Sequence, residues 1–338
     1  MSRFLYKAQK LLIWYVSFLM FSCTHEAIVP NSDCIDFDIP GISFGPDFAE
    51  TGLQYKAPCY NPNNSNEFIY IEELIDGTAQ LVIYNCVTKE KKVIVNDSVN
   101  DVSQPNWGRH NLVAYNSGLH VYVVNLAGAD HTKVGNGVKS WFPEWIHDDN
   151  VLTFVNFYSS DDNFNDAEGV NQATYNFISN TIDTFTIQYN DDYIGILGLG
   201  ASGIDNDYFT ILRMGSYFDN LKLALINSTT HNVLNLVDIS ETMHMGDILC
   251  VQWHPNNHEI YFTHWYGNMY KVDIETGIST VVLESCDSKW YNRFSISPDG
   301  TKMLVEKVNC VFNGLAIYMN STIVEYNIDG SGEKVILE

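Results

Sequence analysis

The stretch Ser297-Pro-Asp-Gly-Thr-Lys-Met-Leu304 decides the fold of this chain, because it joins a tight polar turn to an apolar strand and has counterparts along most of the sequence. The counterparts, each followed by an apolar run, are Tyr60-Asn-Pro-Asn-Asn64, Trp107-Gly-Arg-His-Asn111, Trp145-Ile-His-Asp-Asp-Asn150, Ile204-Asp-Asn-Asp207 and Trp253-His-Pro-Asn-Asn257. They recur at intervals of about 40–55 residues, which is the spacing of a propeller blade. The repeat predicts an architecture, but it does not name a ligand or a reaction.

Each repeat can be divided into four strand-like runs separated by turn residues. In the fifth repeat these runs are Ile248–Trp253, Glu259–His264, Asn268–Asp273 and Ser279–Leu283. Such short links join antiparallel strands, because a parallel crossover needs a dozen or more residues. A four-stranded sheet cannot bury both of its faces alone, so the repeats must stack on one another. The sequence therefore predicts an all-β fold, a β-propeller of about six four-stranded antiparallel blades over residues 53–338.

The two ends of the repeat region bear on how the ring closes. The first repeat begins with its own innermost strand near Gln54–Cys59, and the last repeat ends with its own outermost strand at Glu333–Leu337. A strand exchanged between the termini is therefore not required to complete the last blade. An open solenoid is the competing stack, and the order of hairpins and the period favour the propeller.

The N-terminus has the pattern of a bacterial lipoprotein signal peptide. Basic residues, an apolar run and a cysteine follow one another at Arg3, Lys7, Lys10, Leu11–Phe21 and Cys23. The apolar run is shorter than the ~20 residues that a membrane-spanning helix needs. We therefore predict a signal peptide over residues 1–22, lipidation of Cys23, and a tether with a lead-in segment to the first blade over residues 23–52. The expected location is the cell envelope, as an outer-membrane lipoprotein that faces either the periplasm or the cell surface.

The charge of the chain limits its partners. The formal net charge is −23, and it would become −26 after removal of residues 1–22 with their three cations. Such a surface repels nucleic acid and anionic lipid headgroups. We expect a monomer that contacts the membrane through its N-terminal lipid only, with neutral, cationic or metal-bridged partners and no cofactor.

The remaining cysteines are even in number and lie at Cys34, Cys59, Cys86, Cys250, Cys286 and Cys310. The pairs nearest in sequence, Cys34–Cys59 and Cys286–Cys310, could form disulfides in an oxidising compartment. Buried free thiols packed as small apolar residues are the alternative.

The turns carry a family resemblance. Ser297-Pro-Asp-Gly300 and the stretches Trp253-His-Pro-Asn-Asn257 and Leu119-His-Val-Tyr-Val-Val-Asn-Leu-Ala-Gly128 resemble the WD40-like repeats of TolB-like β-propellers, among them lipoproteins of the Bacteroidota type. The resemblance covers about Gln54–Glu338 and implies a TolB-like propeller. The separate α/β domain that precedes the propeller of TolB has no room in this sequence.

Successive strands of a meander alternate in direction, so the turns alternate between two sides of the disc. The first-to-second and third-to-fourth turns lie on one side, here called the turn side. The second-to-third turns and the links between blades lie on the other, here called the link side. The long insertions Ser159–Gln172, Gly215–Asn220 and Cys310–Met319 belong to the link side, so we expect binding there.

Aromatic residues on the link side are the candidate binding residues, because exposed rings stack on sugars or anchor peptide side chains. The alternative is that some of them pack between blades. The candidates are Trp141, Phe142, Tyr217, Phe218, Trp265, Tyr266, Trp290 and Tyr291.

Two further patterns are weak. Asp161, Asn163 and Asn165 place oxygen atoms at alternating positions, as a calcium loop does, but the glycine and the glutamate that complete such a loop are missing. We interpret the segment as a solvated acidic loop, with weak calcium binding as the alternative. Four histidines, His244, His254, His258 and His264, fall in one repeat but on different ends and faces, so they do not predict a metal site.

Together these patterns favour a lipid-anchored propeller that binds a protein or glycan and has no catalytic residues. The alternative is a polysaccharide lyase or related carbohydrate-active enzyme, since some TolB-like propellers resemble oligogalacturonate lyases that use channel-facing histidines and a metal. Three histidines that converge on the channel would favour the lyase. Aromatic and Asn side chains at the channel mouth would favour binding.

Overall fold

The structure is a computed structural model of the full chain, and all described residues belong to one compact unit, Ile35–Glu338. The described residues are 47–97, 102–128, 131–135, 137, 139–146, 151–158, 169–185, 188–189, 192–193, 195–202, 207–213, 221–227, 230, 232–238, 248–256, 258–264, 267–312 and 316–338.

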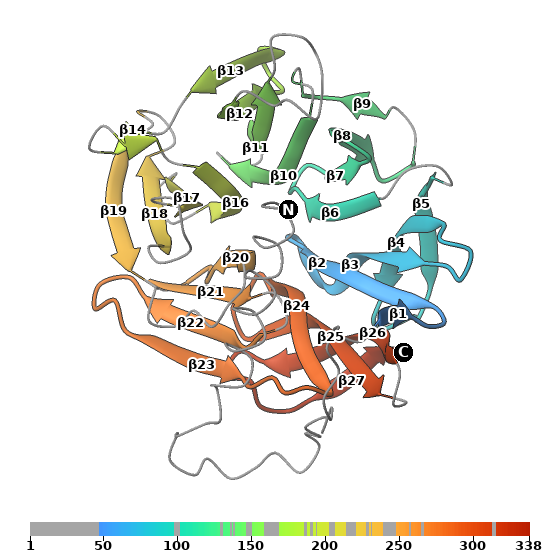
Figure 1. Cartoon of the computed structure of the whole chain (residues 1–338). Helices are drawn as coiled ribbons and strands as arrows, with labels where there is room; N and C mark the ends of the chain where they lie inside the picture. Colours follow the sequence, from blue (N-terminus) through green and yellow to red (C-terminus); the bar gives the residue numbers. More distant parts are fainter. Residues whose placement is uncertain are drawn as a thin grey trace, which may run out of the picture. The chain divides into compact units, whose positions relative to one another are not determined.

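Six consecutive antiparallel sheets surround a common axis in the described part of the chain (Figure 1). Blade 1 consists of β2 (Gln54–Asn61), β3 (Asn64–Glu73), β4 (Ala79–Asn85) and β5 (Lys91–Asp97). Blade 2 consists of β6 (Val102–Trp107), β7 (Leu112–Ser117), β8 (His120–Asn125) and β9 (Thr132–Lys133). Blade 3 consists of β10 (Lys139–Ile146), β11 (Val151–Tyr158), β12 (Gly169–Asn176) and β13 (Thr181–Phe185).

The second half of the chain repeats this order. Blade 4 consists of β16 (Gly195–Ser202), β17 (Asp207–Arg213), β18 (Leu221–Asn227) and β19 (Val233–Asp238). Blade 5 consists of β20 (Ile248–Trp253), β21 (Glu259–His264), β22 (Met269–Asp273) and β23 (Ser279–Leu283). Blade 6 consists of β24 (Lys289–Ile296), β25 (Lys302–Phe312), β26 (Ala316–Asn327) and β27 (Lys334–Leu337), joined by β1 (Asp47–Glu50) as a fifth strand. A two-stranded ribbon, β14 (Gln188–Tyr189) and β15 (Asp192–Tyr193), lies between blades 3 and 4 in the sequence.

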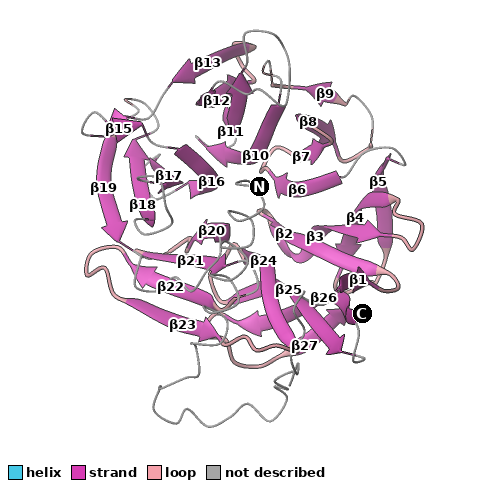
Figure 2. Cartoon of the chain, viewed as in Figure 1, coloured by secondary structure: helices cyan, strands magenta, loops and turns pink. Residues whose placement is uncertain are grey.

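The prediction of an all-β propeller is confirmed. Five sheets have four strands and the sixth has five, and no helix occurs among the residues that the structure describes (Figure 2). No helix that could cross a membrane is therefore found in this part of the chain.

Apolar side chains stack each blade against the next, as the argument from sheet faces requires. One buried cluster joins blade 1 to blade 2 through Leu81 and Val113, and another joins blade 5 to blade 6 through Met269 and Phe294. These four side chains are at most 1% exposed. The described part of the molecule thus has a core divided into layers between blades.

The third-to-fourth turns are closed by a recurring Asn or Asp at the end of the third strand. Its side-chain oxygen accepts a hydrogen bond from a backbone N–H two or three residues later, as in an Asx turn. The residues that do this in blades 1 to 5 are Asn85, Asn125, Asn176, Asn227 and Asp273. These turns lie on the turn side, which is therefore built from short, internally bonded loops.

As expected, the last blade needs no strand exchanged between the termini, but it gains a fifth strand that the sequence did not predict. The strand β1, which belongs to the predicted lead-in segment, pairs in parallel with the first part of β26, whereas β27 pairs with the last part of the same strand. The pairing continues into Thr51, whose N–H donates to the carbonyl of Met319 at 2.9 Å. Although the four strands of blade 6 come from one repeat, β26 extends beyond β27. The free length of its edge is covered by β1.

The two disulfides that we considered are not present. Cys59 and Cys310 are free and buried, so neither Cys34–Cys59 nor Cys286–Cys310 forms. Cys86 and Cys250 are also free, whereas Cys286 is disulfide-bonded.

Candidate functional site

A pocket of about 320 Å³ lies where blades 1, 2 and 6 meet at the inner edge of the ring. Its wall includes side chains from β2, β6 and β24, the innermost strands of these blades, and from the β3–β4 turn at Gly77. Lys56, Ser103 and Trp290 lie in the first half of their strands. Innermost strands begin on the link side, so this pocket, here called the seam pocket, belongs to the side on which we predicted binding.

Bulges in the innermost strands direct side chains toward the pocket and the neighbouring blade. The strand register shifts between Lys56 and Cys59 in β2 and between Ser103 and Asn106 in β6. Within these bulges Ala57 and Gln104 have positive φ angles of 48° and 52°, and each precedes a proline. A bulge bends its strand and redirects the side chains around it. Such backbone costs of order 1–3 kcal/mol per residue and persists only where surrounding structure holds it.

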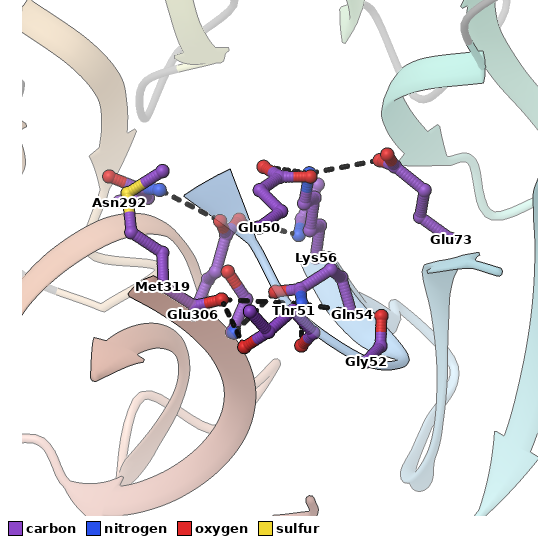
Figure 3. Close-up of polar contacts among 11 residues, drawn as sticks. Glu50, Thr51, Gly52, Gln54, Lys56, Glu73, Asn292, Glu306 and Met319 are labelled. Carbon is purple, nitrogen blue, oxygen red and sulfur yellow. Dashed lines mark hydrogen bonds and ion pairs between the residues drawn. The ribbon is translucent and has the colours of Figure 1, made fainter. Parts of the chain in front are cut away.

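A buried carboxylate connects blade 6 to blade 1 beside the pocket. Glu306 is 4% exposed, and its Oε2 accepts the N–H of Ala57 at 2.9 Å while its Oε1 accepts Nδ2 of Asn292 at 2.8 Å (Figure 3). Burial raises the pKa of Glu306, and the two hydrogen bonds act in the opposite direction. Both carboxylate oxygens are thus engaged by neutral donors of the protein.

A second charged group is already paired. The Nζ of Lys56 donates to Glu50 at 2.7 Å and to Glu73 at 2.9 Å, which joins β1, β2 and β3 (Figure 3). Burial lowers the pKa of Lys56, but the hydrogen bonds to the two carboxylates outweigh it, so the pKa is raised. Lys56 therefore stays protonated at neutral pH and is neutralised by the protein itself.

Arg293 is the cation in the wall without such a partner. Its guanidinium makes no hydrogen bond or ion pair with another described residue, although it is partly buried. Burial lowers the pKa of Arg293, and the nearby Cys250 and Glu306 act in the opposite direction. An arginine remains protonated under these conditions. The pocket thus contains a fixed positive charge with five N–H donors.

Trp290 and Tyr291, two predicted binding residues, have different positions. Trp290 lines the seam pocket, but it is only 6% exposed because it packs against Val308, Cys310 and Ile317. Tyr291 is 2% exposed and lies in the cluster between blades 5 and 6. The expectation of exposed rings is therefore wrong for both, since adjacent residues of one strand face opposite sides of the sheet and both sides are covered.

Trp141 and Phe142 are half-buried at the corresponding bulge of blade 3. Phe142 has a φ of 57°, and its N–H donates to Oε1 of Gln104 in the seam pocket at 3.0 Å. The ring of Trp141 makes edge contacts with Phe142 and Phe157, and the Lys139 ammonium lies over it. These two candidates are thus next to the pocket but do not line it.

The other predicted site residues lie outside the described residues. They are Cys23, Asp161, Asn163, Asn165, Tyr217, Phe218, Trp265 and Tyr266.

Histidines and metal-ligand groups do not mark the site. No histidine lines the seam pocket, and the described residues contain no group of three or more His, Cys, Asp or Glu side chains that could hold a metal ion. The wall instead combines paired carboxylates with hydrogen-bond donors.

Comparison with known proteins identifies the fold. No family model matches the sequence, and no curated protein matches it. Among solved structures, TolB from Acinetobacter baumannii is similar with a TM-score of 0.54 and 14% identity, covering 85% of this chain and 63% of that one. A structure from Agrobacterium tumefaciens with a provisional TolB assignment has a TM-score of 0.57 and 14% identity, covering 76% and 88% of the two chains.

An oligogalacturonate lyase from Vibrio parahaemolyticus is similar as well, with a TM-score of 0.51 and 10% identity over 86% of this chain and 78% of that one. At these identities the likeness concerns the fold alone. The chain therefore has the fold of TolB-like β-propellers, and its function has to be argued from its own residues.

Proposed function

We propose that this chain is an extracytoplasmic, lipid-anchored binding module and that its protein or glycan ligand occupies the seam pocket. The observation that carries the proposal is the set of unused hydrogen-bond donors in the wall, contributed by blades 2 and 6. The guanidinium of Arg293, the side-chain NH2 of Gln104 and the hydroxyl of Ser103 all line the pocket and have no acceptor among the described residues. Convergent polar groups in a concave site are typical of ligand binding.

Binding is favoured over the alternative of a polysaccharide lyase. The lyase hypothesis expects histidines that converge on the channel, and the wall of the seam pocket contains none in the described part of the chain. The carboxylate of Glu306 in this wall accepts hydrogen bonds from Ala57 of blade 1 and from Asn292, so both of its oxygens are engaged by the protein. The similarity to an oligogalacturonate lyase supports the fold and not the reaction.

The binding proposal is tested by filling the pocket. Ser103→Phe adds a ring to a partly buried wall position, whereas Thr280→Phe adds the same ring to an exposed position on β23 of blade 5. The full chain in mild detergent is applied to a glycan array and to immobilised envelope proteins. We expect Ser103→Phe to lose the ligands that the wild type and Thr280→Phe retain. Equal binding by a folded Ser103→Phe protein would move the site elsewhere.

The anchoring proposal has a separate test. The N-terminal pattern ending at Cys23 supports acylation and an envelope location. Metabolic labelling with a palmitate analogue should mark the wild type and not Cys23→Ser. The same extent of labelling in both proteins would remove the lipoprotein proposal without touching the pocket.

A further inference from the structure

We infer that the seam pocket binds the carboxylate group of its ligand, with the Arg293 guanidinium as the principal partner and Gln104 and Ser103 as additional donors. This inference rests on the proposed function, because it assigns a ligand chemistry to the same pocket.

Arg293 is a cation without an ion pair among the residues that the structure describes. Removing a charged side chain from water is costly unless the protein pairs it, and proteins therefore pair buried charges. Lys56 follows this rule through Glu50 and Glu73, whereas the partly buried Arg293 has no ion pair among the described residues. The lack of an ion pair for Arg293 within the described ranges is not explained by a shortage of acidic residues, since the chain has 41 acidic and 18 basic ones.

The carboxylate of Glu306, which acts on Arg293 electrostatically, is already engaged by other groups. Glu306 lines the same pocket and influences Arg293 electrostatically, yet the two side chains form no ion pair. Its two oxygens are held by the backbone of Ala57 and the side chain of Asn292. Glu306 therefore fixes the seam between blades 6 and 1, and no residue in the described part of the chain occupies the guanidinium of Arg293.

The side-chain amide of Gln104 in the same wall is oriented by a hydrogen bond. The Oε1 of Gln104 accepts the N–H of Phe142 at 3.0 Å, so the oxygen is used and the NH2 group is the one left for a ligand. The hydroxyl of Ser103 adds a further donor to the wall. Blade 2 and blade 6 thus both contribute unused donors to the wall.

Donor-rich walls with a guanidinium select planar acceptors. A carboxylate accepts two parallel N–H bonds from one guanidinium, and such charge-assisted pairs are among the stronger hydrogen bonds. A phosphate dianion would face greater repulsion from Glu50, Glu73 and Glu306 in the same wall. The volume of about 320 Å³ is at the lower end of ligand pockets, enough for one acidic sugar or the C-terminal end of a peptide.

The test uses matched probes that differ only in the carboxylate. Glucuronic acid and glucose represent the sugar source, and acetyl-trialanine with a free or an amidated C-terminus represents the peptide source. Each probe is titrated into the full chain in detergent, and binding is followed by ligand-observed NMR. We expect the acid of at least one pair to bind the wild type more tightly than its neutral counterpart, and the pair that responds identifies the source.

The variants isolate the guanidinium. Arg293→Met keeps the length of the side chain without its charge and should weaken binding of the acidic probe about tenfold or more. Arg293→Lys should give an intermediate loss, because it keeps the charge but not the two-pronged geometry. Lys56→Met is the control, since the charge of Lys56 is already balanced by Glu50 and Glu73, and it should change the affinity much less.

Three results would overturn the inference. They are absence of binding by both acidic probes, equal affinity for acid and neutral counterpart, and unchanged affinity in a folded Arg293→Met protein. Thermal melts check folding, and Gln104→Leu supplies a second variant if Arg293→Met does not fold. If a neutral ligand binds and Ser103→Phe abolishes it, the proposed function stands and only the carboxylate is wrong. If Ser103→Phe binds every ligand as the wild type does, the assignment of the binding site to the seam pocket is wrong.

Discussion

The contacts between blades 5 and 6 and those between blades 6 and 1 use equivalent strands of the repeat, but they differ in chemistry. Between blades 5 and 6, the backbone N–H of Ile296 donates to Oε1 of Gln252 at 2.8 Å, a neutral hydrogen bond beside an apolar cluster. Between blades 6 and 1, here called the closing seam, the N–H of Tyr60 donates to Oγ of Ser295 at 3.0 Å. There the buried carboxylate of Glu306 adds a second contact.

The difference shows how a repetitive fold makes one specific site. The contact of Gln252 with Ile296 between blades 5 and 6 is neutral. The closing seam has in addition the buried carboxylate of Glu306, and it borders the pocket that contains Arg293. A charged contact at the closing seam thus lies beside the candidate site in a ring of similar blades.

The largest expected effect tests whether the closing seam is also where the ring opens. Phe68→Ala removes a fully buried ring between blades 6 and 1, and Phe294→Ala removes a ring that is 1% exposed between blades 5 and 6. Each should lower the free energy of unfolding by about 3–5 kcal/mol in urea. Only Phe68→Ala should also speed amide hydrogen exchange in both β2 and β26. The same exchange pattern in the two variants would mean that the seams open alike.

The next effect compares the polar contacts of the two seams. Glu306→Ala leaves the N–H of Ala57 and the amide of Asn292 without their acceptor, whereas Gln252→Ala leaves only the N–H of Ile296. Each buried donor left without an acceptor costs about 1–3 kcal/mol of stability. In Glu306→Ala part of this cost is offset, because the variant no longer buries the charge of Glu306. We expect Glu306→Ala to be the more destabilised in urea melts. A larger loss for Gln252→Ala would reverse the comparison.

A smaller effect concerns the turn side of blades 5 and 6. Gly300 has a φ of +73°, and a Cβ there would lie 2.6 Å from Cε1 of His254. Gly277 has a φ of +70° with nothing within 4 Å of such a Cβ. Gly300→Ala should cost about 1–3 kcal/mol, and Gly277→Ala should cost less because it has backbone strain alone. Thermal melts of the two proteins measure the difference, and equal midpoints would show that His254 moves away freely.

The smallest expected effect is a change in how the free energy of unfolding depends on pH. The pKa of Glu306 is raised in the folded state above its ordinary value of 4.5. The folded state then keeps its proton at a pH where the unfolded state has lost it. Stability therefore falls as pH rises from about 4.5 through the folded pKa. Glu306→Gln cannot titrate at this position. The free energy of unfolding of the wild type should therefore fall relative to that of Glu306→Gln as the pH rises through this window. A constant difference between the two proteins from pH 4 upward would contradict the raised pKa.

The sequence predicted the repeat but not the site, and the reason is physical. A run such as Ile260-Tyr-Phe262 after a polar turn reports local strand structure, so the blades could be counted. Two periodic signals were nevertheless missed. The Asn or Asp that closes the third-to-fourth turns recurs in successive blades, and an X-Pro pair marks the bulges at Ala57, Gln104 and Phe142.

The pocket residues could not be brought together from sequence alone. Arg293 and Gln104 lie in different blades far apart along the chain, and only the closure of the ring places them in one wall. The prediction of exposed aromatic rings failed for Tyr291, which is buried. Strand alternation places its ring on one face of the sheet, but the sequence does not show that a neighbouring blade covers that face. The parallel pairing of β1 was missed because four residues before the first blade carry no repeat signal.

That pairing has a mechanical consequence. Tension applied to the chain on the N-terminal side of Asp47 reaches β1 before it reaches β2, and β1 is held to β26 by only four register pairs. Release of β1 would free residues 47–53, which could then span at most about 23 Å in front of Gln54, at about 3.3 Å per extended residue. The hydrogen bonds of Tyr60 with Ser295 and of Ala57 with Glu306 involve residues on the C-terminal side of Gln54. They would still hold blades 6 and 1 together. Under such tension β1 would therefore detach before the propeller opens.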